Sequence, residues 1–400
     1  MRRGISISSR AMFTPASPIR RLIPYAEKAV QSGKEIYHLN IGQPDIETPS
    51  IYYEYVNNFK PRVVSYSHSA GILELRESFC EYYKRFGISV KPEEIIVTNG
   101  GSEAVMFAMA VVADPGDEIL VVEPFYANYG GFAAQLGIKL VPVTTHPEEG
   151  YSIPSKEAFE SKISARTKAI IFSNPCNPTG AVYDHVQLET IANVAFENDL
   201  FVISDEVYRE FTFDGLKAIS MMHFEKISDR VIMTDSISKR YSACGARIGT
   251  FVTKNPEIYS NVMKFAQARL CPSLLSQYGT LGLLKLDSQY SMTVRKEYQA
   301  RRDVVYEELQ KIQGAVFEKP RGAFYVSVKL PIHNSEEFVK WMLTDFEIDG
   351  KTTMVAPLDG FYATPQGGLN EVRIAYVLEK EKLRDAVRIL KAGIELFNSK

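Results

Sequence analysis

Cysteine is scarce in this 400-residue sequence, which contains only Cys80, Cys176, Cys244 and Cys271. No two of them form the close pair that a zinc site or a disulfide framework would need. The sequence also lacks any apolar stretch near the roughly 20 residues that cross a bilayer. We therefore expect free thiols in a reducing, cytoplasmic compartment, with no metal site and no membrane segment.

An excess of either charge is lacking as well. Lys and Arg number 46 against 48 Asp and Glu, which gives a formal net charge of -2. This balance offers no electrostatic reason to expect nucleic acid or a membrane surface as a partner. Hydrophobic residues make up 45% of the chain and charged residues 24%. That composition supplies a large core and excludes a chiefly disordered protein, and the length suits about two domains.

The first 26 residues lack acidic side chains. They contain five arginines, which are Arg2, Arg3, Arg10, Arg20 and Arg21. One interpretation of this composition is an organelle-targeting peptide. Three prolines interrupt any amphipathic helix there, so we expect an ordered N-terminal arm instead.

Short apolar runs alternate with helical patterns from about residue 70 to 255. Seven of these runs are predicted to be buried strands: Ile95–Val97, Ile119–Val122, Ile138–Val143, Ala169–Phe172, Leu200–Ile203, Val231–Met233 and Gly249–Val252. Helical stretches such as Glu103–Val112 and Gln187–Glu197 lie between them. The alternation predicts βαβ units and a mostly parallel sheet covered on both faces.

The last hundred residues have a different pattern. Val294–Ile312 reads as a long charged helix, and a closing helix is expected from about Glu379 to Phe397. Three short strands are expected between them, at Ala323–Val328, Met354–Ala356 and Val372–Tyr376. The predicted organisation is an N-terminal arm with part of the small domain over residues 1–45, a large domain over 46–295 and a small α+β domain over 296–400.

Residues suited to ligand binding follow several predicted strands. In an open parallel sheet, ligands bind outside the carboxyl ends of the strands. The first strand is followed by Gly100, Gly101 and Ser102 and then by a predicted helix. The free N–H groups at the start of that helix would attract a phosphate, and the alternative is that the glycines form only a tight turn. The next strand leads to Tyr126, which either stacks on a ligand or packs in the core. The fourth ends in a proline-rich turn at Asn177, where a structural turn and a ligand contact are both open.

Two further strand ends carry ionisable side chains. Asp205 follows the fifth strand, where it either serves a ligand or caps a helix. The sixth strand leads to Ser236, Ser238 and Lys239, and Arg247 follows eight residues later. A lone lysine there would be a surface charge, but the serines and the arginine suggest a second phosphate contact. A phosphate-bearing aromatic cofactor anchored covalently to Lys239 accounts for all five strand ends, and pyridoxal phosphate is such a molecule.

The sequence resembles the class I and II aminotransferases of pyridoxal-phosphate fold type I, from residue 17 to the last helix. The most specific matches are Asn177–Gly180, Ser204–Tyr208, and the Ser-x-Ser-Lys motif that ends at Lys239 with Arg247 at the expected distance. The resemblance implies an α/β fold with a large domain, built on a mostly parallel seven-stranded sheet flanked by helices, and a smaller α+β domain. The pattern lies near bacterial aspartate aminotransferases, while Arg269–Pro272 resembles a segment of alanine aminotransferases.

The resemblance also implies the site residues. The expected catalytic residues are Lys239, Asp205 and Tyr208. The expected cofactor-binding residues are Gly101, Ser102, Tyr126, Asn177, Asp205, Tyr208, Ser236, Ser238, Lys239, Arg247 and Tyr66. The expected substrate-binding residues are Gly42, Asn177 and Arg373. By this resemblance Lys239 carries the cofactor as a Schiff base, Asp205 pairs with its ring nitrogen, and Tyr66 reaches the cofactor of a partner subunit.

The implied activity is the transfer of an amino group between an L-amino acid and a 2-oxo acid by a ping-pong mechanism. We expect a homodimer with composite active sites, aspartate as the first-choice donor and 2-oxoglutarate as the acceptor. An alanine, broad or aromatic aminotransferase and a β-lyase on the same fold are the alternatives. A cofactor-binding regulator without catalysis is disfavoured, because no DNA-binding segment has room before residue 43. Arg269 has two interpretations. It either binds the distal carboxylate of an acidic substrate or is a charged residue with a structural role.

Overall fold

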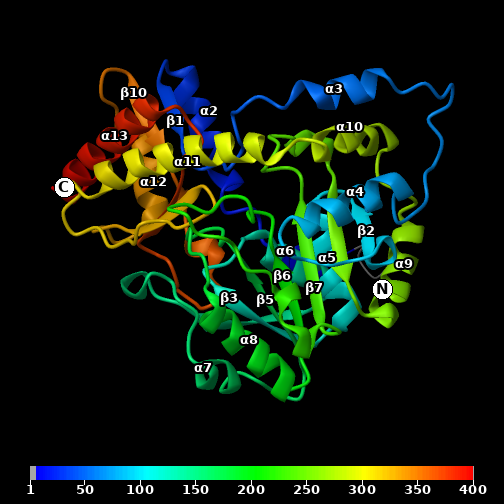
Figure 1. Cartoon of the computed structure of the whole chain (residues 1–400). Helices are drawn as coiled ribbons and strands as arrows, with labels where there is room; N and C mark the ends of the chain where they lie inside the picture. Colours follow the sequence, from blue (N-terminus) through cyan, green and yellow to red (C-terminus); the bar gives the residue numbers. More distant parts are fainter. Residues whose placement is uncertain (1–5, 400) are drawn as a thin grey trace, which may run out of the picture.

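A seven-stranded sheet forms the centre of the larger part of the molecule (Figure 1). The computed structural model describes residues 6–399. In spatial order the strands are β2 (Ile95–Thr98), β8 (Gly249–Thr253), β7 (Val231–Ser236), β6 (Phe201–Asp205), β5 (Thr167–Ser173), β3 (Glu118–Glu123) and β4 (Lys139–Thr144). The strands from β7 to β4 pair in parallel, and β8 runs antiparallel to both of its neighbours. The predicted mostly parallel seven-stranded sheet is confirmed.

Both faces of this sheet are covered by helices, which explains its continuous apolar runs. Successive residues of β3 point to opposite faces, so that Val121 and Val122 belong to separate hydrophobic clusters. One face is packed by α5 (Gly101–Val112), α6 (Asn128–Leu136) and α9 (Pro256–Ala268). The other face is packed by α4 (Leu73–Lys84), α8 (His185–Glu197) and α10 (Leu274–Leu284). Buried β-branched and aliphatic side chains between the layers stabilise the arrangement.

The smaller part of the molecule combines two small sheets with four helices. One sheet is antiparallel, in the order β11 (Ala356–Pro357), β12 (Glu371–Ala375) and β9 (Tyr325–Lys329). The other pairs β1 (Glu35–His38) in parallel with β10 (Lys351–Met354). The helices are α2 (Ile23–Gln31), α11 (Ser288–Leu309), α12 (Ser335–Thr344) and α13 (Lys380–Asn398). Their shared core joins N-terminal residues such as Leu22 to the last third of the chain.

Three sequence predictions need correction. The run Ile138–Val143, predicted to be a buried strand, overlaps β4, whose side chains are mostly only partly buried because β4 lies at the edge of the sheet. The single strand expected at 354–356 is two strands, because the chain leaves its pairing with β1 at Met354 and pairs with β12 from Ala356. The helix expected from Val294 begins six residues earlier, at Ser288. Asp287 explains the earlier start, because its side chain accepts hydrogen bonds from the backbone N–H groups of the first turn.

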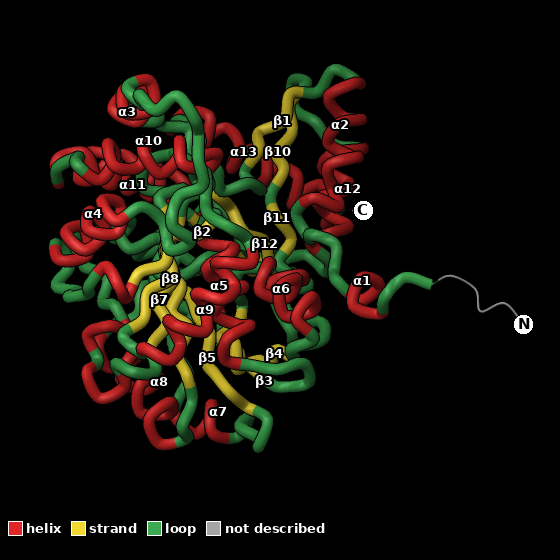
Figure 2. Tube along the Cα trace, turned by 90° about the vertical axis from the view of Figure 1, so that its right-hand side faces the viewer, coloured by secondary structure: helices red, strands yellow, loops and turns green. Residues whose placement is uncertain are grey.

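The described part of the N-terminal arm contains α1 (Ser9–Phe13), which lies beside α6 (Figure 2). Further along the arm, Arg21 forms ion pairs with Glu336 and Asp359, both at 2.6 Å. Arg2 and Arg3 lie outside the described residues. All four cysteines are free thiols. Within residues 6–399 every helix is too short or too polar to cross a membrane.

Candidate functional site

The carboxyl ends of the parallel strands open into a cavity of about 510 Å³. The small antiparallel sheet closes part of it, because Tyr325 of β9 and Arg373 of β12 line the same cavity. The predicted site residues that line it are Gly42, Gly101, Ser102, Tyr126, Asn177, Asp205, Tyr208, Ser236, Ser238, Lys239, Arg247 and Arg373. Residues from distant parts of the chain thus meet where an open α/β sheet binds its ligands.

One end of the cavity is suited to an anion. The helix α5 begins at Gly101, so its unpaired N–H groups face the cavity. Gly100 has a φ of +79°, and a Cβ there would overlap the guanidinium of Arg247, which lies across this helix end. The hydroxyls of Ser236 and Ser238 are 2.8 Å apart on the same cavity wall. A helix N-terminus, two hydroxyls and a guanidinium together offer the donors and positive charge that suit a phosphate group.

Asp205 supplies a buried carboxylate to the cavity. The Tyr129 hydroxyl donates to it at 2.7 Å, and the backbone N–H of Val207 donates at 3.3 Å. Burial outweighs these two hydrogen bonds and, with a smaller contribution from the carboxylates of Asp235 and Glu206, raises the pKa of Asp205 to about 6. Turns rather than an α-helix follow Asp205, so the helix-capping alternative is wrong. The carboxylate has no cationic partner among the described residues, and a cationic nitrogen on a ligand would supply one.

Lys239 presents its amine to the same cavity. Its Nζ donates to the Gly42 carbonyl at 2.9 Å and lies 3.8 Å from the Cys244 sulfur. No carboxylate in the described part of the chain forms an ion pair with this amine. A lysine in a partly buried cavity without an acidic partner is a candidate for covalent chemistry.

Arg373 is a second cation without an acidic partner, and only 2% of it is exposed. Its Nη1 donates to the Asn177 side chain at 3.0 Å and its Nη2 to the Asn40 carbonyl at 2.7 Å, while its Nε is buried without a partner. The guanidinium lies over the Tyr325 ring, 4.4 Å from the ring centroid. A buried cation with an unused donor favours an anionic ligand group beside it.

The aromatic side chains of the site include two that the sequence analysis missed. The hydroxyl of Tyr208 lies 2.8 Å from that of Tyr325, and burial raises the pKa of Tyr208 well above its usual value. A Cβ at Gly42 would overlap the Tyr325 hydroxyl, which explains the glycine. Tyr129, which donates to Asp205, packs edge-on against Tyr126 with ring centroids 5.6 Å apart. No local motif marks Tyr129 or Tyr325, since both approach the site only through the fold.

Two predicted residues lie away from the cavity. Tyr66 is 79% exposed and does not line the cavity of its own chain. The Arg269 guanidinium donates to Glu103 at 3.1 Å and to the backbone carbonyl of Val97 at 2.7 Å. These contacts support the structural interpretation of Arg269 and leave the distal-carboxylate interpretation without a place in the cavity.

Comparison with known proteins agrees with this geometry. The sequence profile described as aminotransferase class I and II matches residues 35–390. The chain is 30% identical to a probable aspartate/prephenate aminotransferase of Aquifex aeolicus, over 99% of this chain and 100% of that protein. It is 31% identical to aromatic-amino-acid aminotransferase 2 of Thermococcus litoralis, over 96% and 97% of the two chains.

Solved structures show the same similarity. A mutant aspartate aminotransferase of Thermus thermophilus has a TM-score of 0.87 and 29% identity, covering 98% of this chain and 100% of its own. An alanine aminotransferase from Pyrococcus furiosus has a TM-score of 0.90 and 32% identity with the same coverage. The similarity therefore covers the fold and nearly the full length of each chain.

Proposed function

This chain belongs to the class I and II aminotransferases, which use pyridoxal phosphate, and we propose that its first-choice amino donor is aspartate. One observation carries the proposal of amino-group transfer at this site. A single cavity brings together the amine of Lys239, the buried carboxylate of Asp205 and the guanidinium of Arg373. Neither of the two cations forms an ion pair with an acidic side chain in the described chain. The first binds a carbonyl compound, the second a cationic nitrogen and the third a carboxylate.

The residues fit pyridoxal phosphate at both ends of that molecule. The N-terminus of α5, Ser236, Ser238 and Arg247 would hold the phosphate, and Asp205 would pair with the ring nitrogen. Tyr208 and Asn177 would donate to the ring oxygen, with the Tyr126 ring beside the cofactor. When bound, the cofactor supplies an aromatic ring that accepts the electron pair of the substrate Cα–H bond.

The protein's own groups perform the remaining steps. Arg373 and Asn177 orient the substrate through its α-carboxylate, and the backbone at Gly42 assists. The Lys239 amine would take the proton from the substrate Cα as a general base and, once protonated, would serve as the general acid that delivers it. The Asp205 carboxylate would stabilise a positive charge on the ring nitrogen by charge pairing. The small sheet narrows the cavity, which limits access of water to these charges.

The donor preference rests on Arg20 rather than Arg269. Arg20 lines the cavity, and no acidic side chain among residues 6–399 pairs with its guanidinium. Arg373 is proposed to bind the substrate α-carboxylate, and Arg247 is proposed to bind the cofactor phosphate. Arg20 is therefore available to bind a second carboxylate on the substrate. The relatives named aspartate aminotransferases support the same donor.

An apolar or aromatic donor is the second candidate. Ile19, Ile23 and Ile41 line the cavity together with Arg20, and they offer an apolar surface to a substrate side chain. The relative named aromatic-amino-acid aminotransferase 2 points the same way. Mixing the enzyme with single amino acids in the absence of a 2-oxo acid, and following the cofactor absorbance, ranks the donors directly.

Replacing Arg20 with alanine is expected to lower kcat/KM for aspartate by about 10- to 100-fold, since it removes a charged hydrogen bond. The value for alanine should change less than about threefold, because alanine lacks a distal carboxylate. Arg20→Lys, which keeps the charge, should retain part of the aspartate activity. Equal effects of Arg20→Ala on aspartate and alanine would remove the basis for the aspartate preference.

Cofactor affinity is expected to depend on pH through Asp205. Its pKa is raised to about 6 in the cofactor-free protein, so the carboxyl is increasingly protonated below that pH. A protonated carboxyl does not pair with a cationic ring nitrogen, so binding should weaken by up to about tenfold per pH unit below 6. The affinity of cofactor-free protein for pyridoxal phosphate, titrated between about pH 5 and 8, measures this effect.

Asp205→Asn is the control for that titration. The phosphate of the cofactor titrates near pH 6 in both proteins, so only the difference between them reports Asp205. The wild type should bind the cofactor more tightly at about pH 8, and the advantage should shrink toward pH 5. If cofactor affinity depends on pH in the same way in the wild type and in Asp205→Asn, Asp205 does not pair with the cofactor.

We also propose a homodimer with composite active sites. Tyr66 is exposed and does not line the cavity of its own chain, so its side chain is available to a partner's cofactor. The arm presents Met12 and Phe13 to solvent, 64% and 77% exposed, which is apolar surface that a second subunit would cover. Sedimentation of the active enzyme tests the proposal.

A further inference from the structure

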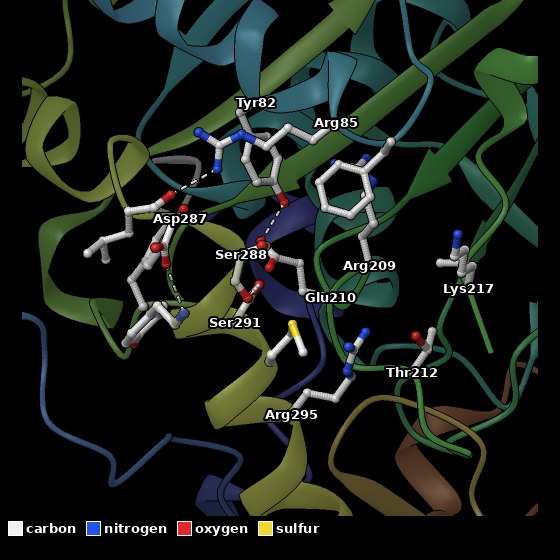
Figure 3. A pocket seen from close by; sticks show the side chains of 16 residues that line it. Tyr82, Arg85, Arg209, Glu210, Thr212, Lys217, Asp287, Ser288, Ser291 and Arg295 are labelled. Carbon is white, nitrogen blue, oxygen red and sulfur yellow. Dashed lines mark hydrogen bonds between the residues drawn. The ribbon is translucent and has the colours of Figure 1, made fainter. Parts of the chain in front are cut away.

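A second cavity, the α11 pocket, lies at the N-terminal end of α11 and has a volume of about 410 Å³ (Figure 3). None of the described residues lines both this pocket and the candidate active site. Its walls come from the end of α4, the loop after β6, the turn after Lys239 and the first three turns of α11. Its lining includes Tyr82, Phe86, Glu210, Tyr241, Tyr290 and Arg295.

Three basic side chains of the pocket have no ion pair. Arg85 donates to the backbone carbonyls of residues 286 and 284, at 2.9 and 3.1 Å. Neither Lys217 nor Arg295 has an acidic partner in the part of the chain that the structure describes. Figure 3 shows the three basic residues on different sides of Glu210. An anion in the pocket would therefore meet positive charge from several directions.

The two acidic side chains of the pocket already have partners. Glu210 accepts a hydrogen bond from the Tyr82 hydroxyl at 2.8 Å and lies 3.9 Å from the Arg240 guanidinium. Asp287 accepts from the backbone N–H of Gln289 at 3.0 Å, as the cap of α11. These contacts reduce the negative charge that the pocket presents, so the unpaired cations favour an anionic ligand.

Aromatic rings form the apolar part of the pocket. Tyr241 and Tyr290 stack with centroids 5.8 Å apart and an interplanar angle of 23°, and Phe86 lies on the same lining. The Tyr290 hydroxyl is buried and has no hydrogen-bond partner. Burial and the nearby Glu210 raise the pKa of Tyr290 to about 12, so the hydroxyl keeps its proton at neutral pH. It is an unsatisfied donor on a residue of the pocket lining.

We propose that the α11 pocket binds a small aromatic carboxylate and that its occupancy changes the rate of transamination. The ring packs against Phe86, Tyr241 and Tyr290, and the carboxylate accepts from the basic side chains. A cavity of about 410 Å³ is large enough for one substituted ring. The chemistry of the pocket, rather than its position alone, selects this class of ligand.

The pocket shares two chain segments with the candidate active site. Arg209 and Glu210 directly follow Tyr208, and Tyr241 lies two residues after Lys239. Arg209 also donates to Asp235 at 3.1 Å, the residue next to Ser236 of the phosphate site. A ligand that packs on these segments displaces the loops that position Tyr208 and Lys239, so the two sites are coupled through the packed chain.

Titration calorimetry of the holoenzyme with 4-hydroxybenzoate tests the proposal. This probe has an aromatic ring and a carboxylate but no amino or 2-oxo group, so it is not a substrate. The double variant Lys217→Ala/Arg295→Ala should raise its Kd at least about tenfold, and Tyr290→Phe about threefold or more. The matched variant Lys162→Ala/Lys264→Ala removes two basic side chains outside the pocket lining and should leave Kd unchanged.

Arg373→Ala distinguishes the α11 pocket from the active site. If the probe binds in the α11 pocket, this variant should leave the Kd of the probe unchanged. If Arg373→Ala weakens binding and the pocket variants do not, the proposal is overturned. Saturating probe should also change kcat or KM for transamination in the wild type but not in Lys217→Ala/Arg295→Ala. A bound probe that changes neither constant would overturn the regulatory role, and no measurable binding would overturn the site itself.

Discussion

Replacing Lys239 with alanine is expected to lower kcat by more than about 10⁴-fold, because in the proposed mechanism one amine both carries the cofactor and moves the substrate proton. The amine lies 2.9 Å from the Gly42 carbonyl and has no acidic partner in the described chain, and no other lysine lines the cavity among the described residues. The fold should persist, since the side chain is only partly buried. Single-turnover rates with aspartate and alanine measure the loss.

Lys239→Arg is the matched control for charge. It keeps a cation in the cavity, but a guanidinium does not deprotonate at neutral pH, so this variant should be nearly as inactive as Lys239→Ala. Borohydride treatment of the wild type should fix the cofactor to Lys239, as peptide mapping would show. A cofactor found on any other lysine, or substantial activity in Lys239→Arg, would refute the assignment.

Replacing Arg373 with alanine is expected to weaken every substrate alike, by roughly 2–5 kcal/mol in kcat/KM. All amino-acid donors carry an α-carboxylate, and the variant would leave that carboxylate buried without a cation. The guanidinium is 2% exposed and fixed by the Asn177 side chain and the Asn40 carbonyl. Steady-state kinetics with aspartate, alanine and one aromatic donor measure the effect.

Arg373→Lys should recover part of the loss, because it restores the charge but not the two-pronged contact. Arg269→Ala is the matched control for removing an arginine near the large sheet, since Arg269 does not line the cavity. Arg269→Ala should affect the stability of the α5 region, through Glu103, more than any substrate constant. If Arg373→Ala lowers kcat/KM for only one amino-acid donor, Arg373 contacts the substrate side chain rather than the α-carboxylate.

Much of the fold follows from patterns that are local in the sequence. Each of the seven strands of the large sheet overlaps an apolar run, because most of these strands bury the side chains of both faces against helices; β4, at the edge, is only partly buried. The small sheets were harder to predict. β1 pairs with β10 across more than 300 residues, and no pattern within Glu35–His38 marks its partner. Pairing over such a distance depends on the packing of the complete chain.

The sequence by itself determined the chemistry of the site, through motifs that follow strand ends. The carboxyl ends of parallel strands meet at one edge of the sheet, so Asp205 and Lys239 come together once their strands are known. Only the tertiary structure decided which other side chains complete the cavity. Tyr325 and Arg20 reach it from the small sheet and the N-terminal arm, while Arg269 is held by Glu103 away from it. The physical reason is that a motif records local backbone geometry, whereas the partner of a side chain depends on long-range packing.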